Sequence, residues 1–154
     1  MSEDINKYTN EQLIQLLNSK NELDSYNLLN LVYKENEISN KYYSCFDEFL
    51  LMVDGKTSFT RMRGIGLCLS LAKWDVDNKI EKNFDKFISL LYDEKPTTVR
   101  VAIGWFKNLL MYKPHLASDV LKALDHIDYT KYKETMSPLV KKDVESLRKE
   151  VLKY

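Results

Sequence analysis

The sequence predicts an all-α fold, and three observations support this prediction. The chain of 154 residues contains only 4 glycines and 3 prolines, whereas strand-and-turn architectures need such residues at most of their turns. Apolar residues recur at intervals of three and four, as they do on the buried face of a helix. Residues 58–74 are apolar over most of their circumference, which is typical of a helix between layers of other helices.

The first half of the chain begins with a segment without apolar periodicity, residues 1–8, which we expect to be loose. Thr9 and Gln12 have the spacing of a capping box, which predicts the start of the first helix. Ser39 is the expected cap of the third helix, and Gly55 lies where a left-handed C-terminal cap is expected. The four helices predicted in this half span residues 10–19, 21–35, 40–54 and 58–74.

Four more helices are predicted in the second half, each with a single apolar face. Asp75 or Asp77 is expected to cap the fifth helix, and Thr97 or Thr98 the sixth. Residues 93–96 are predicted to form a turn, because the residue before a proline avoids helical geometry. Ser137 is the expected cap of the last helix. The apolar faces of these helices run over residues 80–91, 99–110, 116–127 and 140–151.

The composition is that of a globular protein, with 44% hydrophobic and 30% charged residues. A chain of this length suits one domain that buries most of its apolar surface. Cys45 and Cys68 lie in apolar helical contexts, so we expect reduced core residues of a cytoplasmic protein. No apolar run approaches the roughly 20 residues of a membrane span, and the polar start does not resemble a signal peptide.

The formal charge is zero, but it is unevenly distributed along the chain. Residues 1–77 carry 8 basic and 12 acidic side chains, whereas residues 78–154 carry 15 basic and 11 acidic ones. A dedicated nucleic-acid-binding protein usually has a strong net basic surplus, which this chain lacks. A local basic face in the second half remains compatible with the sequence.

The chain contains an internal repeat of about 37 residues, which indicates stacked helical hairpins. A shift of this length places Arg63 on Arg100. Two antiparallel helices per repeat of this length are typical of an α-solenoid. The same shift also superimposes apolar positions, namely Ile65 with Ala102, Leu69 with Phe106, Phe84 with Leu121 and Phe87 with Leu124.

Three motifs resemble HEAT and armadillo-type repeats: Thr57-x-x-x-Arg61-x-Arg63-Gly64, Lys95-Pro96-Thr97-Thr98-Val99-Arg100 and Tyr132-x-x-x-Met136-x-x-Leu139-Val140-x-x-Asp143. Together they resemble small, mostly uncharacterised bacterial helical-repeat proteins, some of which carry the label SufBD. The resemblance implies a right-handed α–α superhelix of about eight helices, in one domain over residues 1–154 with residues 57–130 as the best-defined repeats. It implies no catalytic residues. The iron–sulfur assembly suggested by the label has no support, because the sequence lacks a Cys/His cluster.

The candidate interaction residues are three arginines, one tryptophan and one lysine. Arg61, Arg63 and Arg100 could form a basic stripe that contacts an acidic partner or a phosphate. The structural alternative is that each arginine bonds helix-end carbonyls or acids of a neighbouring repeat. Trp105 lies beside the apolar stripe of its helix and could anchor an interface, or could be a core residue whose polar edge finds a partner. Lys107 completes the candidate set.

No metal, cofactor or catalytic site is expected. His115 and His126 are the only histidines, and their predicted separation of about 16 Å prevents them from sharing one metal ion. Neither a G-x-S-x-G motif nor a Cys–His signature is present. Gly64 and Gly66 lie inside a predicted helix, so they are expected to allow close helix packing rather than to bind phosphate.

The sequence therefore favours a non-enzymatic protein-interaction scaffold or adaptor in the cytoplasm, with an unidentified protein partner on the concave face of a short α-solenoid. The alternative is a nucleic-acid-binding protein related in architecture to the HEAT-like DNA glycosylases. In that case Arg61, Arg63, Arg100, Trp105 and Lys107 would supply the contacts.

Overall fold

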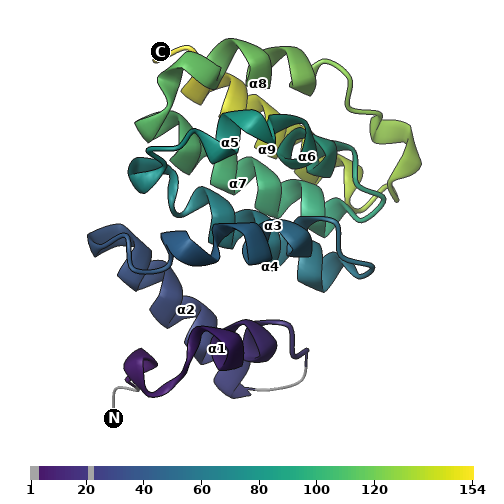
Figure 1. Cartoon of the computed structure of the whole chain (residues 1–154). Helices are drawn as coiled ribbons and strands as arrows, with labels where there is room; N and C mark the ends of the chain where they lie inside the picture. Colours follow the sequence, from purple (N-terminus) through teal and green to yellow (C-terminus); the bar gives the residue numbers. More distant parts are fainter. Residues whose placement is uncertain (1–3, 21–22) are drawn as a thin grey trace. The chain divides into compact units, whose positions relative to one another are not determined.

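The computed structural model of the chain describes residues 4–20 and 23–154, and the regular elements in these ranges are all helical (Figure 1). The predicted all-α fold is confirmed. The contacts divide the chain into two compact units, Met1–Asp75 and Val76–Tyr154, which are described separately. The superhelical arrangement of the hairpins, and their union into one repeat domain, stay predictions.

The first unit is built from two helix pairs. Helix α1 packs on α2, and α3 packs on α4 with the most extensive contact of the unit, while α2 also contacts α4. Among its described residues, the unit also contains the 3-10 helices η1 (Ile5–Lys7), η2 (Tyr43–Cys45) and η3 (Ala72–Trp74). The α-helices are α1 (Asn10–Leu17), α2 (Leu23–Ile38), α3 (Phe46–Val53) and α4 (Ser58–Leu69).

Helix α4 forms the centre of the first unit, as predicted. Every residue from 63 to 69 is buried, so the helix is covered on more than one side. A Cβ atom at Gly64 would lie 2.5 Å from the backbone nitrogen of Val53 and 2.7 Å from the carbonyl carbon of Met52. Glycine therefore lets α4 approach the last turn of α3 more closely than any other residue would. The predicted role of Gly64 in close packing is confirmed.

Several predicted boundaries in the first unit are wrong. The described part of residues 1–8 is ordered, because the Asp4 side chain caps η1 by accepting from the Asn6 amide at 2.8 Å and Ile5 is buried. Residues 1–3 lie outside the described ranges. Gly55 does not have a left-handed backbone. Helix α4 ends at Leu69 rather than Trp74, and the chain turns there into η3.

The capping box at the start of α1 is confirmed. The Thr9 hydroxyl accepts from the Gln12 amide at 3.1 Å, and the Gln12 side chain accepts from the Thr9 amide at 3.0 Å. The third helix begins later than predicted, because Ser39 is followed by a turn and by η2 before α3 starts at Phe46. Its predicted inner face is correct, since Tyr42, Phe46, Phe49 and Val53 are all buried.

The second unit is organised around α7 (Pro96–Tyr112), which contacts α9, η4 and η5. The predicted inward face of α7 is confirmed, and so is that of the last helix. The Tyr92 hydroxyl donates to the carbonyl of Ala123 at 2.8 Å, which ties η4 to α8. The other elements are α5 (Lys79–Lys82), α6 (Phe84–Ser89), η4 (Leu90–Tyr92), η5 (Pro114–Leu116), α8 (Ala117–Leu124), η6 (Tyr129–Lys131) and α9 (Ser137–Val151).

The predicted fifth helix is divided into α5 and α6 at Asn83, whose side-chain amide donates to the Lys79 carbonyl at 2.8 Å. Such side chains compete with the backbone of a helix. Asn78, with a φ of 55°, occupies the cap position of α5. The prediction of Asp75 or Asp77 as the cap is wrong.

Two further predicted caps in the second unit are also wrong. Lys95 precedes the first residue of α7, Pro96, so neither Thr97 nor Thr98 is the cap. Proline suits the first helical position because it has no amide hydrogen to leave unpaired. Ser137 is the first residue of α9 rather than its cap.

The sequence predicted two reduced core cysteines and no membrane-spanning helix. Cys45 and Cys68 are free and buried, as predicted. Burial raises the pKa of both thiols above the ordinary value, so both are protonated at neutral pH. None of the helices in the described ranges combines the length and the apolar character needed to cross a membrane.

Candidate functional site

The two predicted site residues of the first unit are engaged within its fold. The Arg63 side chain donates to the Leu17 carbonyl at 3.1 Å and to the Ser25 hydroxyl at 2.5 Å. Its guanidinium carbon also lies 4.2 Å from the centre of the Phe59 ring. Burial lowers the pKa of Arg63, partly offset by Tyr33, but a guanidinium remains charged in proteins.

Arg63 therefore completes the C-terminal end of α1. The Ser25 hydroxyl donates to the carbonyls of Leu16 at 2.7 Å and Ser19 at 3.0 Å, and Arg63 reaches the carbonyl between them. A cation at a helix C-terminus is favoured by the helix dipole and by the unpaired carbonyls there. Arg61 has a similar local contact, because it donates to the Gly55 carbonyl at 3.0 Å. These are contacts of the kind that the structural alternative expects.

The other three predicted residues lie on α7 in the second unit, and the structure groups two of them. Arg100 pairs with Asp143 of α9, with Nε 2.6 Å from Oδ2. Lys107 donates to the Ser146 hydroxyl of the same helix at 2.5 Å. Trp105 is half-buried and lies roughly 150° around the helix axis from both, at 100° per residue. A single contact surface of α7 and α9 therefore includes Arg100 and Lys107 but not Trp105.

We call this surface the basic face. Lys142, Ser146 and Lys149 are exposed and are spaced by four and three residues, so they form one stripe along α9. Across from them lies Gly104 of α7, which is exposed and would have nothing within 4 Å of an added Cβ atom. The basic face comprises Arg100, Gly104 and Lys107 from α7 and Lys142, Asp143, Ser146 and Lys149 from α9.

The charge of the basic face is only partly compensated. Its single carboxylate, Asp143, is engaged by Arg100. The remaining cations, Lys107, Lys142 and Lys149, make no ion pair with a carboxylate among residues 4–20 and 23–154. Clustered charges of one sign attract ligands of the opposite sign.

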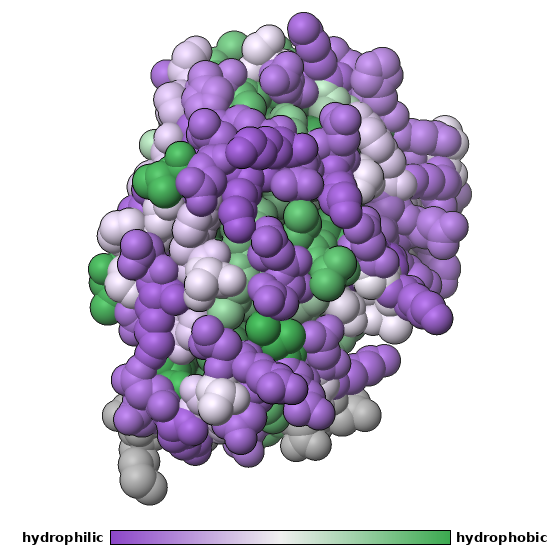
Figure 2. Space-filling model, viewed as in Figure 1, coloured by the Kyte–Doolittle hydropathy of each residue, from purple (hydrophilic) through white to green (hydrophobic). Residues whose placement is uncertain are grey.

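Hydrophilic residues cover most of the face that Figure 2 shows, and apolar residues are visible between them, several of them near the centre of the view. Exposed apolar residues are normal for a protein surface and do not by themselves mark a site.

A cluster that the sequence reasoning missed lies at the junction of α5 and η5. Lys113 is 6% exposed, and its ammonium is 2.6 Å from Oε1 of Glu81. His115 Nε2 lies 2.8 Å from the other oxygen of the same carboxylate. Burial alone would raise the pKa of Glu81, but the hydrogen bonds from Lys113 and His115 outweigh it, and the pKa is lowered.

The cluster has the chemistry of a structural ion pair. A carboxylate that orients a histidine occurs in catalytic triads, but there the histidine contacts a nucleophile on its other side. Among the described residues, the hydrogen bond of His115 is to Glu81, and Lys113 occupies the second carboxylate oxygen. No group of three or more His, Cys, Asp or Glu side chains in the described part of the chain could hold a metal ion. The only signal in the sequence is that Lys113 and His115 follow Glu81 by 32 and 34 residues, which is close to the length of one predicted repeat.

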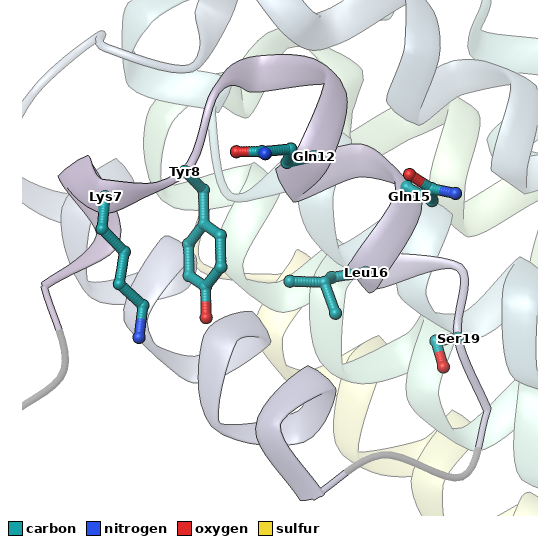
Figure 3. Close-up of a pocket in the computed structure, with 6 residues that line it drawn as sticks. All are labelled: Lys7, Tyr8, Gln12, Gln15, Leu16 and Ser19. Carbon is teal, nitrogen blue, oxygen red and sulfur yellow. The ribbon is translucent and has the colours of Figure 1, made fainter.

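The first unit also contains a pocket, with a volume of about 650 Å³ (Figure 3). It lies beside α1, between η1 at one end and the segment after α1 at the other. Figure 3 shows Tyr8 and Leu16 extending into the same space from opposite sides. The residues that line it are Lys7, Tyr8, Gln12, Gln15, Leu16 and Ser19.

Comparisons with protein-family models, with curated proteins and with solved structures found no match to this chain. The likeness to HEAT-type repeats therefore rests on the three motifs and the 37-residue period alone. A functional conclusion has to come from the surfaces described above.

Proposed function

We propose that this chain is a non-enzymatic protein-interaction scaffold or adaptor of the cytoplasm, and that it contacts its partner through the basic face of α7 and α9. The observation that supports the proposal is a set of three lysines around an exposed helical glycine, and none of these lysines pairs with a carboxylate of the described residues. The two buried, reduced cysteines are consistent with the cytoplasm.

If the basic face had no partner, there would be no structural reason for a glycine at position 104. A glycine inside a helix destabilises it by roughly 0.5–1 kcal/mol relative to alanine. No neighbouring atom within 4 Å requires the absence of a side chain at this position. A partner helix that packs closely on α7 would supply the reason, as Gly64 allows α3 and α4 to pack within the first unit.

The surrounding residues suit such a contact. Met111 lies one turn beyond Lys107 on the same side of α7 and is 62% exposed, so its flexible side chain can adapt to an apolar partner surface. The exposed lysines would mainly accelerate association and select an acidic partner, because rim charges contribute more to rate and specificity than to affinity.

Site-specific photocrosslinking tests this proposal. A photoreactive phenylalanine analogue at Met111, which is 62% exposed on the same side of α7, leaves Gly104 unchanged. We expect one discrete protein adduct in the cells that make the chain, and its loss when Lys107, Lys142 and Lys149 are changed to glutamate. The matched control places the analogue at Ser118, an exposed residue of α8. Equal adducts at both positions, or adducts that survive charge reversal, would contradict the proposal.

Nucleic acid is the alternative partner, because the same lysines could contact phosphates. Three phosphate contacts predict a slope of about −2 to −3 in a plot of log affinity against log salt. Fluorescence anisotropy with short single- and double-stranded DNA and RNA measures this slope. Affinity that follows it and disappears in the triple glutamate variant would favour the alternative. Absence of binding at low salt would exclude it.

A further inference from the structure

Two side-chain contacts join α7 and α9 across the basic face. The Nε atom of Arg100 lies 2.6 Å from the carboxylate of Asp143, and the ammonium of Lys107 donates to the Ser146 hydroxyl at 2.5 Å. The second contact lies further along the chain than the first on both helices. The two helices therefore run in the same direction here, and residues of one can be placed beside residues of the other.

Gly104 and the lysines of α9 fall at related levels along this surface. Gly104 lies between Arg100 and Lys107, and therefore between the two contacts. On α9, Lys142 precedes the first contact by one residue, and Lys149 follows the second by three. These two lysines thus lie on either side of the level of Gly104. They are about 10 Å apart along the helix axis, at 1.5 Å per residue.

A helical partner matches this spacing, and an extended partner does not. Side chains seven residues apart on a helix lie on one face, about 10 Å from each other along the axis. Side chains on one face of an extended segment are about 7 or 13 Å apart. The regular elements among the described residues are all helical, so these residues offer no sheet edge to which a strand could be added.

The charges determine which side chains of a partner helix can face the surface. Lys142 and Lys149 make no ion pair with a carboxylate among residues 4–20 and 23–154. The carboxylates on the adjoining side of α9 are already engaged by cations of the chain itself, at 2.6 Å for Asp143 and 2.8 Å for Glu150. The two lysines are therefore available to two carboxylates of a partner.

The missing side chain at Gly104 determines what can lie midway between those carboxylates. An added Cβ atom would meet nothing within 4 Å, so the backbone of α7 is open to close approach at this point. The distance between two packed helices depends on the size of the side chains at their contact. A small residue on the partner lets its backbone come closest to α7 at the level of Gly104.

We infer that the partner of the basic face presents an amphipathic helix with two acidic residues seven positions apart and a glycine, alanine or serine midway between them. The carboxylates lie at Lys142 and Lys149, and the small residue lies on Gly104. This inference rests on the proposed function, because it describes the partner that the scaffold contacts.

Synthetic helices test the spacing directly. The matching peptide is rich in alanine and glutamine, is about 18 residues long so that a helix can form, and carries two glutamates seven positions apart with alanine midway. The control peptide has the same composition, but its glutamates are five positions apart, which places them about 140° from each other around the helix. A third peptide keeps the matching glutamates and has leucine at the midway position.

Binding is measured by NMR titration of the full chain labelled with ¹⁵N at low salt. We expect the matching peptide to shift the amide signals of residues 100–107 and 142–149, with a dissociation constant on the order of 100 μM. The control peptide should bind about tenfold more weakly, because its two glutamates cannot reach both lysines, and the leucine peptide about fivefold more weakly. Equal affinity of the three peptides, or no shift with the matching peptide at about 1 mM, would overturn the inference.

Two variants of the chain separate the charge from the close approach. Lys149→Gln should reduce the affinity for the matching peptide about tenfold. Its matched control is Lys122→Gln, which changes an exposed lysine of α8 outside the basic face and should leave the affinity unchanged. Gly104→Ala keeps every lysine and should weaken the matching peptide about threefold. Equal binding by the two lysine variants, or undiminished binding by Gly104→Ala, contradicts the inference.

Other occupants of the basic face give different results. Signals of this face that shift when the chain alone is diluted would assign it to a second copy, and displacement of the matching peptide by a short DNA duplex of higher affinity would assign it to nucleic acid. Either result excludes the inferred helix. Equal binding of the matching and control peptides, together with a charge-dependent adduct at Met111, refutes the inference but not the proposed function. Spacing-dependent peptide binding without any adduct in cells counts against the proposed function alone.

Discussion

A shift of 37 residues places Arg63 on Arg100, but the two arginines have different physical environments. Arg63 is 7% exposed and bonds neutral oxygens of elements that precede it in the chain. The side chain of Arg100 is 39% exposed and pairs with a carboxylate of α9, which follows it. A repeated residue type therefore does not imply a repeated role. The energy of each arginine depends on how much water its partners have lost.

The glycines of the two central helices show the same contrast. Gly64 of α4 faces the backbone of α3 at distances that leave no space for a methyl group. Gly104 of α7 faces open space. The identity of the residue is the same, but one glycine is required by packing inside the first unit, and the other is not required by any described contact. The following changes test this comparison, in order of decreasing effect.

Gly64→Ala should give the largest change. The added methyl group would force α3 and α4 apart, and overpacking against backbone destabilises by roughly 3 kcal/mol. Urea denaturation followed by circular dichroism measures the free energy of unfolding. A loss below about 0.5 kcal/mol would mean that α3 and α4 separate without cost.

Arg63→Met and Arg100→Met form a matched pair. Removal of Arg63 leaves buried oxygens at the end of α1 without a donor, so a loss of roughly 2–3 kcal/mol is expected. Removal of Arg100 breaks a partly exposed ion pair, which contributes at most about 1 kcal/mol. The same denaturation experiment compares them. Similar losses for the two variants would show that burial is not what separates these arginines.

The Glu81 cluster predicts a dependence of stability on pH. Because the pKa of Glu81 is lowered from its ordinary value of 4.5, its ionised form stabilises the fold above that pH, and this contribution is lost as the pH falls through the lower, folded-state pKa. Glu81→Gln should cost about 1 kcal/mol at neutral pH. The difference between the two proteins should disappear in acid, and a difference that is constant from neutral pH to pH 3 would contradict the assignment.

Gly104→Ala should produce the smallest effect and the opposite sign. With open space around the site, alanine is expected to stabilise α7 by roughly 0.5–1 kcal/mol. The same variant should weaken the photocrosslinking of neighbouring positions if a partner packs closely on α7. If the variant is more stable and its contact with the partner is unchanged, Gly104 is not needed for partner binding at the basic face.

The regular parts of this fold could be predicted because burial follows local periodicity. The inner faces of α3, α7 and α9 were identified from apolar spacing alone, since 3.6 residues per turn places those residues on one side. The ends of the helices could not be identified in this way. Asp75 has the chemistry of a cap, but the Tyr43 hydroxyl, 32 residues earlier, donates to it at 2.5 Å. Whether the Asp75 carboxylate caps a helix or accepts from Tyr43 depends on tertiary contacts, which apolar periodicity does not predict.

The candidate site was predictable in part for the same reason. Arg100 and Lys107 share a side of α7 through their spacing of seven, so their common face follows from sequence. Its partner residues on α9 do not, because helix pairing decides which stripe of α9 lies beside α7. The Lys113–Glu81 pair and the pocket at Tyr8 and Leu16 depend on pairing as well.

The hydrogen bond from Arg63 to the last turn of α1 predicts how the chain tolerates truncation. A helix of eight residues is not stable by itself in water, so α1 persists through its attachment to Ser25 and Arg63. Deleting it would remove the Leu17 carbonyl that accepts from Arg63 and would expose the apolar surface against which Leu13 and Leu17 are buried. A truncated product that starts after α1 should therefore aggregate on expression, whereas fusions placed ahead of Asp4 should preserve the first unit.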